Sequence, residues 1–155
     1  MSSMSLSPAV ATSPSLSQES RVVDWGRFAL VGLATVVASG LSTILVYYAG
    51  DAVVRYDPKF VELGSAVGDG IFTAVLAIGA VLVYAGLLRF ARNPVRTYTI
   101  VSAAVLLLSL IPDFTIAPAD PGATNAQVAV LVLMHFVAAA VIVPMLVTLA
   151  RPQGR

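Results

Sequence analysis

Long runs of apolar residues, separated by short polar segments, dominate the chain. Residues 28–49, 71–88 and 126–150 contain no Asp, Glu, Lys or Arg. About 20 apolar residues in a helix are enough to cross the ~30 Å hydrocarbon core of a bilayer. These three segments are therefore expected to be transmembrane helices.

A fourth apolar run, residues 97–111, lies between the second and the last of these segments. It is too short to be assigned as a transmembrane helix by hydropathy alone. Asn93 and Pro94 extend it, because an Asn N-cap followed by Pro at the first helical position commonly starts a helix. Pro112 is expected to end it, since proline restricts the preceding residue and lacks a backbone donor. The four predicted spans are residues 28–49, 68–88, 94–111 and 126–150.

Composition favours a membrane protein over a water-soluble helical bundle. Of 155 residues, 58% are hydrophobic and 11% are charged, and the mean hydropathy is +0.91. Soluble domains contain roughly 25% charged residues. We therefore expect an all-α fold over residues 21–155, an integral membrane four-helix bundle with short loops.

The first 20 residues differ from the rest, since they are rich in Ser and show no hydrophobic periodicity. We expect residues 1–20 to be a disordered N-terminal tail. A cleaved signal peptide is the competing interpretation. It is disfavoured because the first basic residue is Arg21, and because the following apolar run exceeds the ~7–15 residues of a signal-peptide core.

The basic residues indicate an orientation. Only Arg55 and Lys59 fall on one side of the predicted spans. The other side holds Arg21, Arg27, Arg89, Arg92, Arg96, Arg151 and Arg155. Cytoplasmic loops are enriched in Lys and Arg, so both termini are expected in the cytoplasm. The preference for Arg over Lys, with frequent Ala, Val and Gly, suggests a GC-rich bacterial genome. The expected location is therefore the cell (inner) membrane.

Three ionisable residues are candidate polar or proton sites: His135, Asp113 and Asp69. Ionisable groups within a membrane are costly and often functional. His135 lies about ten residues into the fourth span, or about 15 Å from its outer end. There an imidazole can carry protons, bind a polar ligand or ligate a cofactor. The alternative is a neutral histidine bonded to a neighbouring helix.

Asp113 and Asp69 are expected near the outer boundary, where the alternative for each is a helix cap or a loop charge. The helical rise puts Asp113 roughly a dozen Å above His135. No direct contact between these two side chains is therefore expected.

Small and polar residues mark the faces on which the helices are expected to pack. They recur at three- and four-residue intervals in the first two spans, a spacing that lets helix backbones approach closely. The predicted packing positions are Gly32, Ser39, Gly64, Gly68, Gly70 and Ala77. A polar-lined cavity between the helices is the alternative interpretation.

No catalytic motif is found along the chain. The absence of Cys excludes disulfides, thiolate metal sites and cysteine nucleophiles, and a single His is a poor metal site because tetrahedral zinc needs about four ligands. We expect no catalytic residue, no metal, no cofactor and no nucleic-acid partner.

The second half of the chain carries several short motifs. Pro112-Asp113 closes the predicted third span, and Met134-His135 and Ile142-Val143-Pro144 lie in the fourth. In these motifs the chain resembles small four-helix bacterial integral membrane proteins classed as a domain of unknown function, over roughly residues 24–150. The resemblance implies four helices and no assigned activity.

The sequence leaves three hypotheses for function. The first is a structural, accessory or regulatory membrane subunit, partnered by the lipid bilayer and by a homo-oligomer or larger membrane complex. The second is an oligomeric transporter or channel that uses His135 at mid-membrane, with Asp113 or Asp69 near the outer mouth. The third is a membrane enzyme or cofactor protein.

Overall fold

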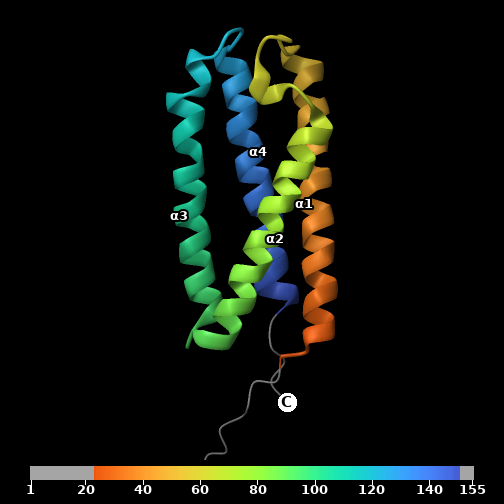
Figure 1. Cartoon of the computed structure of the whole chain (residues 1–155), viewed down its shortest axis with the longest axis vertical. Helices are drawn as coiled ribbons and strands as arrows, with labels where there is room; N and C mark the ends of the chain where they lie inside the picture. The colour runs from red at the N-terminus through yellow and green to blue at the C-terminus, as the bar shows by residue number, and fades with distance from the viewer. Residues whose placement is uncertain (1–22, 151–155) are drawn as a thin grey trace, which may run out of the picture.

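The computed structural model describes residues 23–150, which form a bundle of four long helices running alternately up and down (Figure 1). The helices are α1 (Trp25–Val54), α2 (Ala66–Phe90), α3 (Pro94–Thr115) and α4 (Asn125–Pro144). Short 3-10 turns, η1 (Val61–Leu63) and η2 (Ala117–Ala119), lie in the connections at the upper end in Figure 1. The predicted tail (residues 1–20), Arg21, Arg151 and Arg155 lie outside the described residues.

All four helices are long and apolar enough to cross a membrane. Large apolar side chains point outward, as shown by Leu30 and Leu45, each 71% exposed. Polar Thr35 and Ser39, by contrast, are completely buried on the inner side of α1. This is the reverse of the soluble pattern, in which polar side chains are mostly exposed. The chain is a multi-pass membrane protein, and the predicted all-α four-helix bundle is confirmed.

Side chains from the preceding residue cap three of the four helices. Asp24, Ser65 and Thr124 each accept a hydrogen bond from a backbone N–H in the first turn of α1, α2 and α4. Such a bond satisfies one of the N–H groups that a helix start leaves without a partner. Asn93 precedes Pro94 at the start of α3, as expected, but its side chain makes no cap bond.

The expectation that Pro112 ends the third span is wrong. α3 continues through Pro112 to Thr115, and the N–H of Ile116 still donates to the Pro112 carbonyl at 2.8 Å. A proline removes one backbone donor, which costs little here because the helix ends within one turn. Together with η2, the apolar helical segment extends to Ala119.

A second proline, Pro144, marks a change of helix type in the fourth span. α4 ends at Pro144, and the π-helix η3 (Met145–Leu149) continues it. The hydroxyl of Thr148 donates to the Pro144 carbonyl at 2.6 Å. Loss of the proline donor thus coincides with a wider turn, as is common where the regular bond ladder is interrupted.

The backbones of α1 and α2 approach each other closely at a pair of glycines. A Cβ atom added to Gly40 would lie 3.0 Å from the carbonyl oxygen of Gly70. A Cβ added to Gly70 would lie 3.2 Å from the carbonyl oxygen of Gly40. One turn further along each helix, the Thr43 hydroxyl donates to the Thr73 hydroxyl at 3.2 Å. The two glycines therefore determine how tightly α1 and α2 pack.

Four of the predicted packing residues, Gly32, Ser39, Gly70 and Ala77, are buried in α1 or α2. The remaining two are exposed. A Cβ on Gly64 or Gly68 would meet only atoms of the turn that contains it.

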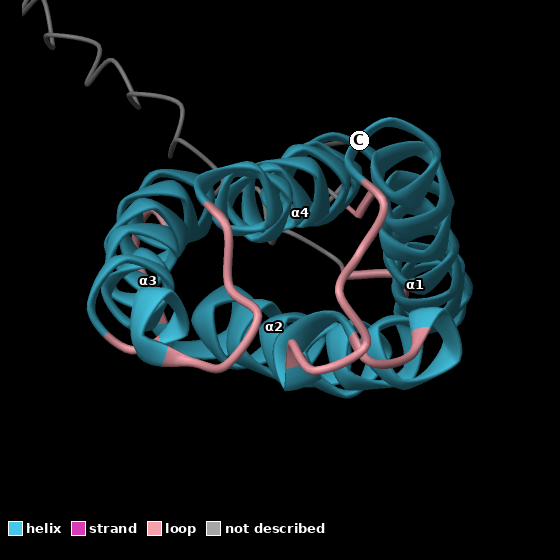
Figure 2. Ribbon diagram, turned by 90° about the horizontal axis from the view of Figure 1, so that it is seen from above, coloured by secondary structure: helices cyan, strands magenta, loops and turns pink. Residues whose placement is uncertain are grey.

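Packing among the helices is uneven. α2 lies mainly along α1, and α3 lies mainly along α4, whereas α2 and α4 touch at few points. Near the lower end, Tyr84 of α2 stacks on Phe28 of α1 and contacts Tyr98 of α3, with ring centroids 6.3 Å and 4.9 Å apart. From this aromatic cluster α2 diverges from α3 toward the upper end, so that space opens between them (Figures 1 and 2).

The α1–α2 contact gives a first prediction. Gly40→Val should lower the free energy of unfolding by about 1–3 kcal/mol, the usual cost of adding methyl groups to a tightly packed interior. Gly86→Val is the matched control, because a Cβ on Gly86 meets nothing within 4 Å. Unfolding in mixed micelles, followed by circular dichroism, measures both. Equal effects of the two substitutions would show that the Gly40–Gly70 approach is not a tight contact.

Candidate functional site

A cavity of about 460 Å³ lies between α2, α3 and α4. Its wall follows α2 from Asp69 to Val83, or about 21 Å at the rise of an α-helix. One face of α3 contributes Tyr98, Ser102, Ser109 and Asp113. The cavity therefore extends along most of the length of the bundle and carries polar groups on one side.

His135 of α4 and Asp113 of α3 meet on the wall of this cavity. His135 Nδ1 lies 3.0 Å from Asp113 Oδ2 and 3.0 Å from the carbonyl oxygen of Leu131. The Asp113 side chain is 8% exposed and the His135 side chain is 34% exposed. The structure thus brings two predicted site residues together, and the expectation that they make no direct contact is wrong.

The direction of helical side chains explains the contact. Side chains in an α-helix lean toward its N-terminus. Because α3 and α4 are antiparallel, the side chain of Asp113 leans down into the bundle while that of His135 leans up toward it. In addition, the third helical segment continues to Ala119, so Asp113 does not lie at its end. Both effects bring the two side chains closer in depth than the positions of their backbone atoms along the helices indicate.

The surroundings of Nδ1 indicate which nitrogen of His135 carries the proton. Both neighbours of Nδ1, the Leu131 carbonyl and the Asp113 carboxylate, are acceptors. Nδ1–H therefore donates, and its hydrogen bond goes to Leu131. Asp113 Oδ2 has a charge contact with the ring but no hydrogen-bond donor among the residues described.

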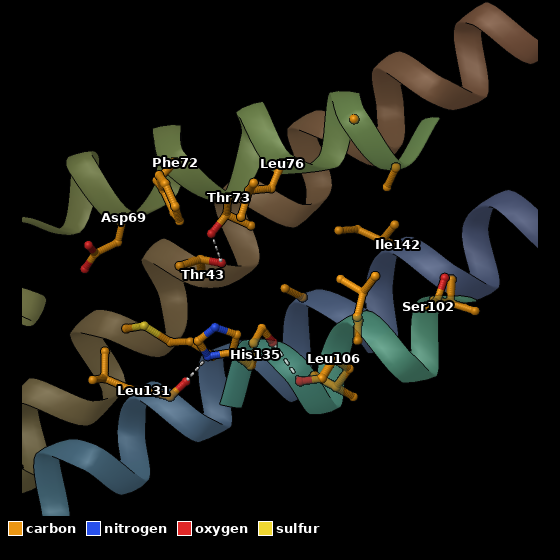
Figure 3. A pocket seen from close by; sticks show the side chains of 18 of the residues that line it. Thr43, Asp69, Phe72, Thr73, Leu76, Ser102, Leu106, Leu131, His135 and Ile142 are labelled. Carbon is orange, nitrogen blue, oxygen red and sulfur yellow. Dashed lines mark hydrogen bonds between the residues drawn. The ribbon is translucent and has the colours of Figure 1, made fainter. Parts of the chain in front are cut away.

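The other ring nitrogen, Nε2, faces the cavity on the side of Thr43 and Thr73 (Figure 3). With the proton on Nδ1, Nε2 keeps a lone pair and can accept a proton from the cavity. The resulting imidazolium would lie beside the Asp113 carboxylate, so the pair can store one proton.

Asp69 lies across the cavity from His135, in the first turn of α2 (Figure 3). Its Oδ2 atom is buried and has no hydrogen-bond partner within residues 23–150. Glu62 of η1 also contributes to the wall, at the upper end. The lining residues in the described part of the chain include no Lys or Arg, so the cavity has an acidic wall with one imidazole.

Tyr56, in the connection that follows α1, is hydrogen-bonded to that helix. The Tyr56 hydroxyl donates to the Tyr47 carbonyl at 2.9 Å. Burial, reinforced by the negative charge of Asp51, raises the pKa of Tyr56 to about 12. The phenol therefore stays neutral at physiological pH and holds the connection against α1.

Sequence comparison places the chain in a family. The model of a family of unknown function, DUF6069, matches residues 22–152. The chain belongs to this family. No curated protein and no solved structure matches it. Membership confirms the resemblance seen in the motifs of the second half, and the family description assigns no activity.

Other site features of this DUF6069 protein were not predicted. Thr43, Thr73 and Glu62 line the cavity but were not among the predicted site residues. The signal for Thr43 and Thr73 is their place beside the small-residue faces of α1 and α2. Glu62 has no such signal, because its position depends on the path of a connection. Across residues 23–150 there is no group of three or more His, Asp or Glu residues that could hold a metal ion.

The His135–Asp113 contact gives a second prediction, tested by a double-mutant cycle with His135→Gln and Asp113→Asn. The two side chains are in direct contact, with Nδ1 and Oδ2 3.0 Å apart. The coupling energy between the two sites should therefore be about 0.5–3 kcal/mol, the range found for residues in contact.

Unfolding in mixed micelles measures this coupling. The control cycle pairs His135→Gln with Thr99→Val, because Thr99 is exposed on α3 and does not line the cavity, and its coupling should be close to zero. A His135–Asp113 coupling no larger than that of the control would contradict a direct interaction.

Proposed function

We propose that the protein is a small transporter that moves protons along the cavity between α2, α3 and α4. One observation carries the proposal: His135, oriented by Leu131 and Asp113, presents Nε2 to the cavity. A histidine paired with a carboxylate in a membrane is suited to taking up and releasing protons, because such chains form the relays of pumps and transporters.

The polar face of α3 supports a path on either side of the pair. Tyr98, Ser102 and Ser109 follow one face of α3 below Asp113, and all three line the cavity. Their hydroxyls both donate and accept hydrogen bonds, as a proton relay through side chains and water requires. Above the pair, Asp69 and Glu62 line the wall toward the upper end.

The second candidate function is that of a structural, accessory or regulatory subunit of a membrane complex. Gly68 in the first turn of α2 and Gly64 in the connection before it favour it, because both are exposed and small residues leave room for another chain to approach closely. The same surface would serve a homo-oligomer, which the transporter function also allows. The two functions differ in whether the isolated protein moves protons.

We also propose a cell-membrane location with both termini in the cytoplasm, in the inner membrane if the source is bacterial. Within the described residues, Arg27, Arg89, Arg92 and Arg96 lie at the lower end and Arg55 and Lys59 at the upper end. Loops rich in Lys and Arg stay in the cytoplasm, so the lower end is assigned to the cytoplasmic side.

Proton flux tests the transporter function. Purified protein in phosphatidylcholine liposomes should acidify or alkalinise the lumen when a potassium diffusion potential is applied, as measured with an enclosed pH-sensitive dye. His135→Leu removes the proton acceptor and should lower the flux at least about tenfold, because a group essential to the path is lost.

Thr99→Val is the matched control for this experiment. Thr99 is exposed on α3, its hydroxyl donates to the Val95 carbonyl at 3.0 Å, and it does not line the cavity. Its replacement should leave the flux unchanged. Unchanged flux in His135→Leu would exclude His135 from the path. A wild-type protein that carries no protons but co-purifies with a partner from native membranes would instead support the subunit function.

The proposed orientation is tested by single-cysteine labelling, since the natural chain contains no Cys. Val61→Cys lies at the upper end and Asn93→Cys at the lower end, and both positions are exposed. A membrane-impermeant maleimide applied to intact cells should label the variant at position 61. The variant at position 93 should react only after permeabilisation. The reverse pattern would invert the topology.

A further inference from the structure

The wall of the cavity changes character along its length. Its upper half holds all the carboxyl groups and the imidazole of the lining, which are Glu62, Asp69, Asp113 and His135. Its lower half has the hydroxyls of Tyr98 and Ser102 on α3 and is otherwise mainly apolar, with Val83, Val101, Val105 and Ile142. A cavity divided in this way matches a molecule that has one polar end and an apolar body.

The charge of the residues that line the upper half determines whether the polar end of a ligand must be positive or negative. Glu62, Asp69 and Asp113 supply three carboxylates, and the lining within residues 23–150 has no Lys or Arg to balance them. A phosphate or carboxylate headgroup would be repelled here, whereas a cation would be attracted. His135 is the one lining group that can become positive, by taking up a proton.

Two carboxylate oxygens in this half lack hydrogen-bond donors. Asp113 Oδ2 and Asp69 Oδ2 are buried without such a donor in the described part of the chain. Asp113 itself is only 6% exposed. Buried polar atoms in folded proteins are almost always hydrogen-bonded, because desolvation without a partner is costly. A ligand that brings N–H donors and positive charge would satisfy both requirements.

We propose that the cavity binds an amphiphilic amine, with its protonated nitrogen in the acidic upper half, where Asp113 and Asp69 line the wall, and its apolar body along the lower half. The proposal rests on the proposed transport function and names its substrate class. A volume of about 460 Å³ is within the roughly 300–1,000 Å³ typical of small-molecule sites. A neutral ligand could bond to His135 Nε2 but would leave both carboxylates without a cation.

The same geometry couples the amine to a proton. An imidazolium at His135 and an ammonium group both compensate the Asp113 carboxylate, and they repel each other. When the amine arrives, the proton on Nε2 leaves to water, and the total charge of the site is unchanged. The ionisable groups that line the cavity are Glu62 from η1, Asp69 from α2, Asp113 from α3 and His135 from α4, with Tyr98 of α3 about four turns below Asp113, while α1 contributes only Thr43.

Binding of matched twelve-carbon probes tests the proposal. Titration calorimetry uses the full-length protein in phosphatidylcholine nanodiscs, with empty nanodiscs as the reference for partitioning into lipid. Dodecylamine should bind at one site near pH 8. Dodecanol and laurate, which replace the ammonium by a neutral and a negative group, should bind at least about tenfold more weakly, since an opposite charge supplies the discrimination.

Variants locate the site. Asp113→Asn and Asp69→Asn should each weaken dodecylamine binding about tenfold, because each removes a charge that faces the ligand. Having two variants keeps the test valid if one of them fails to fold. Thr99→Val, on the lipid-facing side of α3, should bind like the wild type. Dodecanol binding as tightly as dodecylamine, or dodecylamine binding unaffected by both Asn substitutions, would overturn the proposal.

Proton release on binding tests the exchange. Titrations in buffers with different ionisation enthalpies give the number of protons released when dodecylamine binds. His135→Gln should retain binding and release fewer protons than the wild type, and equal release by the two proteins would refute the exchange. Proton flux without amine binding would contradict the proposed amine ligand and leave the proposed transport function intact. Amine binding without proton flux would support the amine site and contradict the transport function.

Discussion

The close approach of Gly40 and Gly70 determines how the rest of the bundle is arranged. With a backbone carbonyl of one helix near the Cα of the other, α2 lies against α1 at its upper end and cannot also lie against α3 there. At the lower end the contact between Tyr84 and Tyr98 and the short turn into Pro94 keep α2 and α3 together. The cavity is the consequence of these two constraints, one at each end of α2.

Packing in lipid makes this arrangement possible. In water the apolar faces of α2 and α3 would be driven together, whereas lipid chains are as apolar as the helices and supply no such force. Helix contacts in a membrane depend on close fit and on polar bonds, such as the one between Thr43 and Thr73. Along the upper part of α2 and α3 the facing walls carry the bulky side chains Phe72, Leu76 and Leu106, so the two backbones do not approach closely there.

The sequence predicted the number of helices, their approximate positions and the buried face of α1 and α2, because hydropathy and small-residue spacing report directly on lipid and close packing. The predictions from sequence were wrong where a contact between side chains depends on how two helices are placed relative to each other. Asp113 was assigned to the outer boundary because Pro112 was read as a stop. A proline in the last turns of a helix removes only one bond, however, and α3 continues to Thr115.

The Asp113–His135 contact illustrates the same limit. Its two residues were identified from their chemistry, but their meeting depends on the antiparallel arrangement of α3 and α4 and on the lean of their side chains toward opposite ends of the bundle. Spacing within one helix contains no information of this kind. Glu62 is a further case, since a connection rather than a helix brings it to the cavity.

Stability alone does not account for the upper half of the cavity. A buried ion pair is often no more stable than well-packed apolar residues of similar size, and here Asp113 Oδ2 lacks even a hydrogen bond from the described residues. The carboxylate and the cavity lie at the same place, and a molecule with a positive charge would both occupy the cavity and compensate Asp113. The pair and the cavity are therefore best understood as parts of one site.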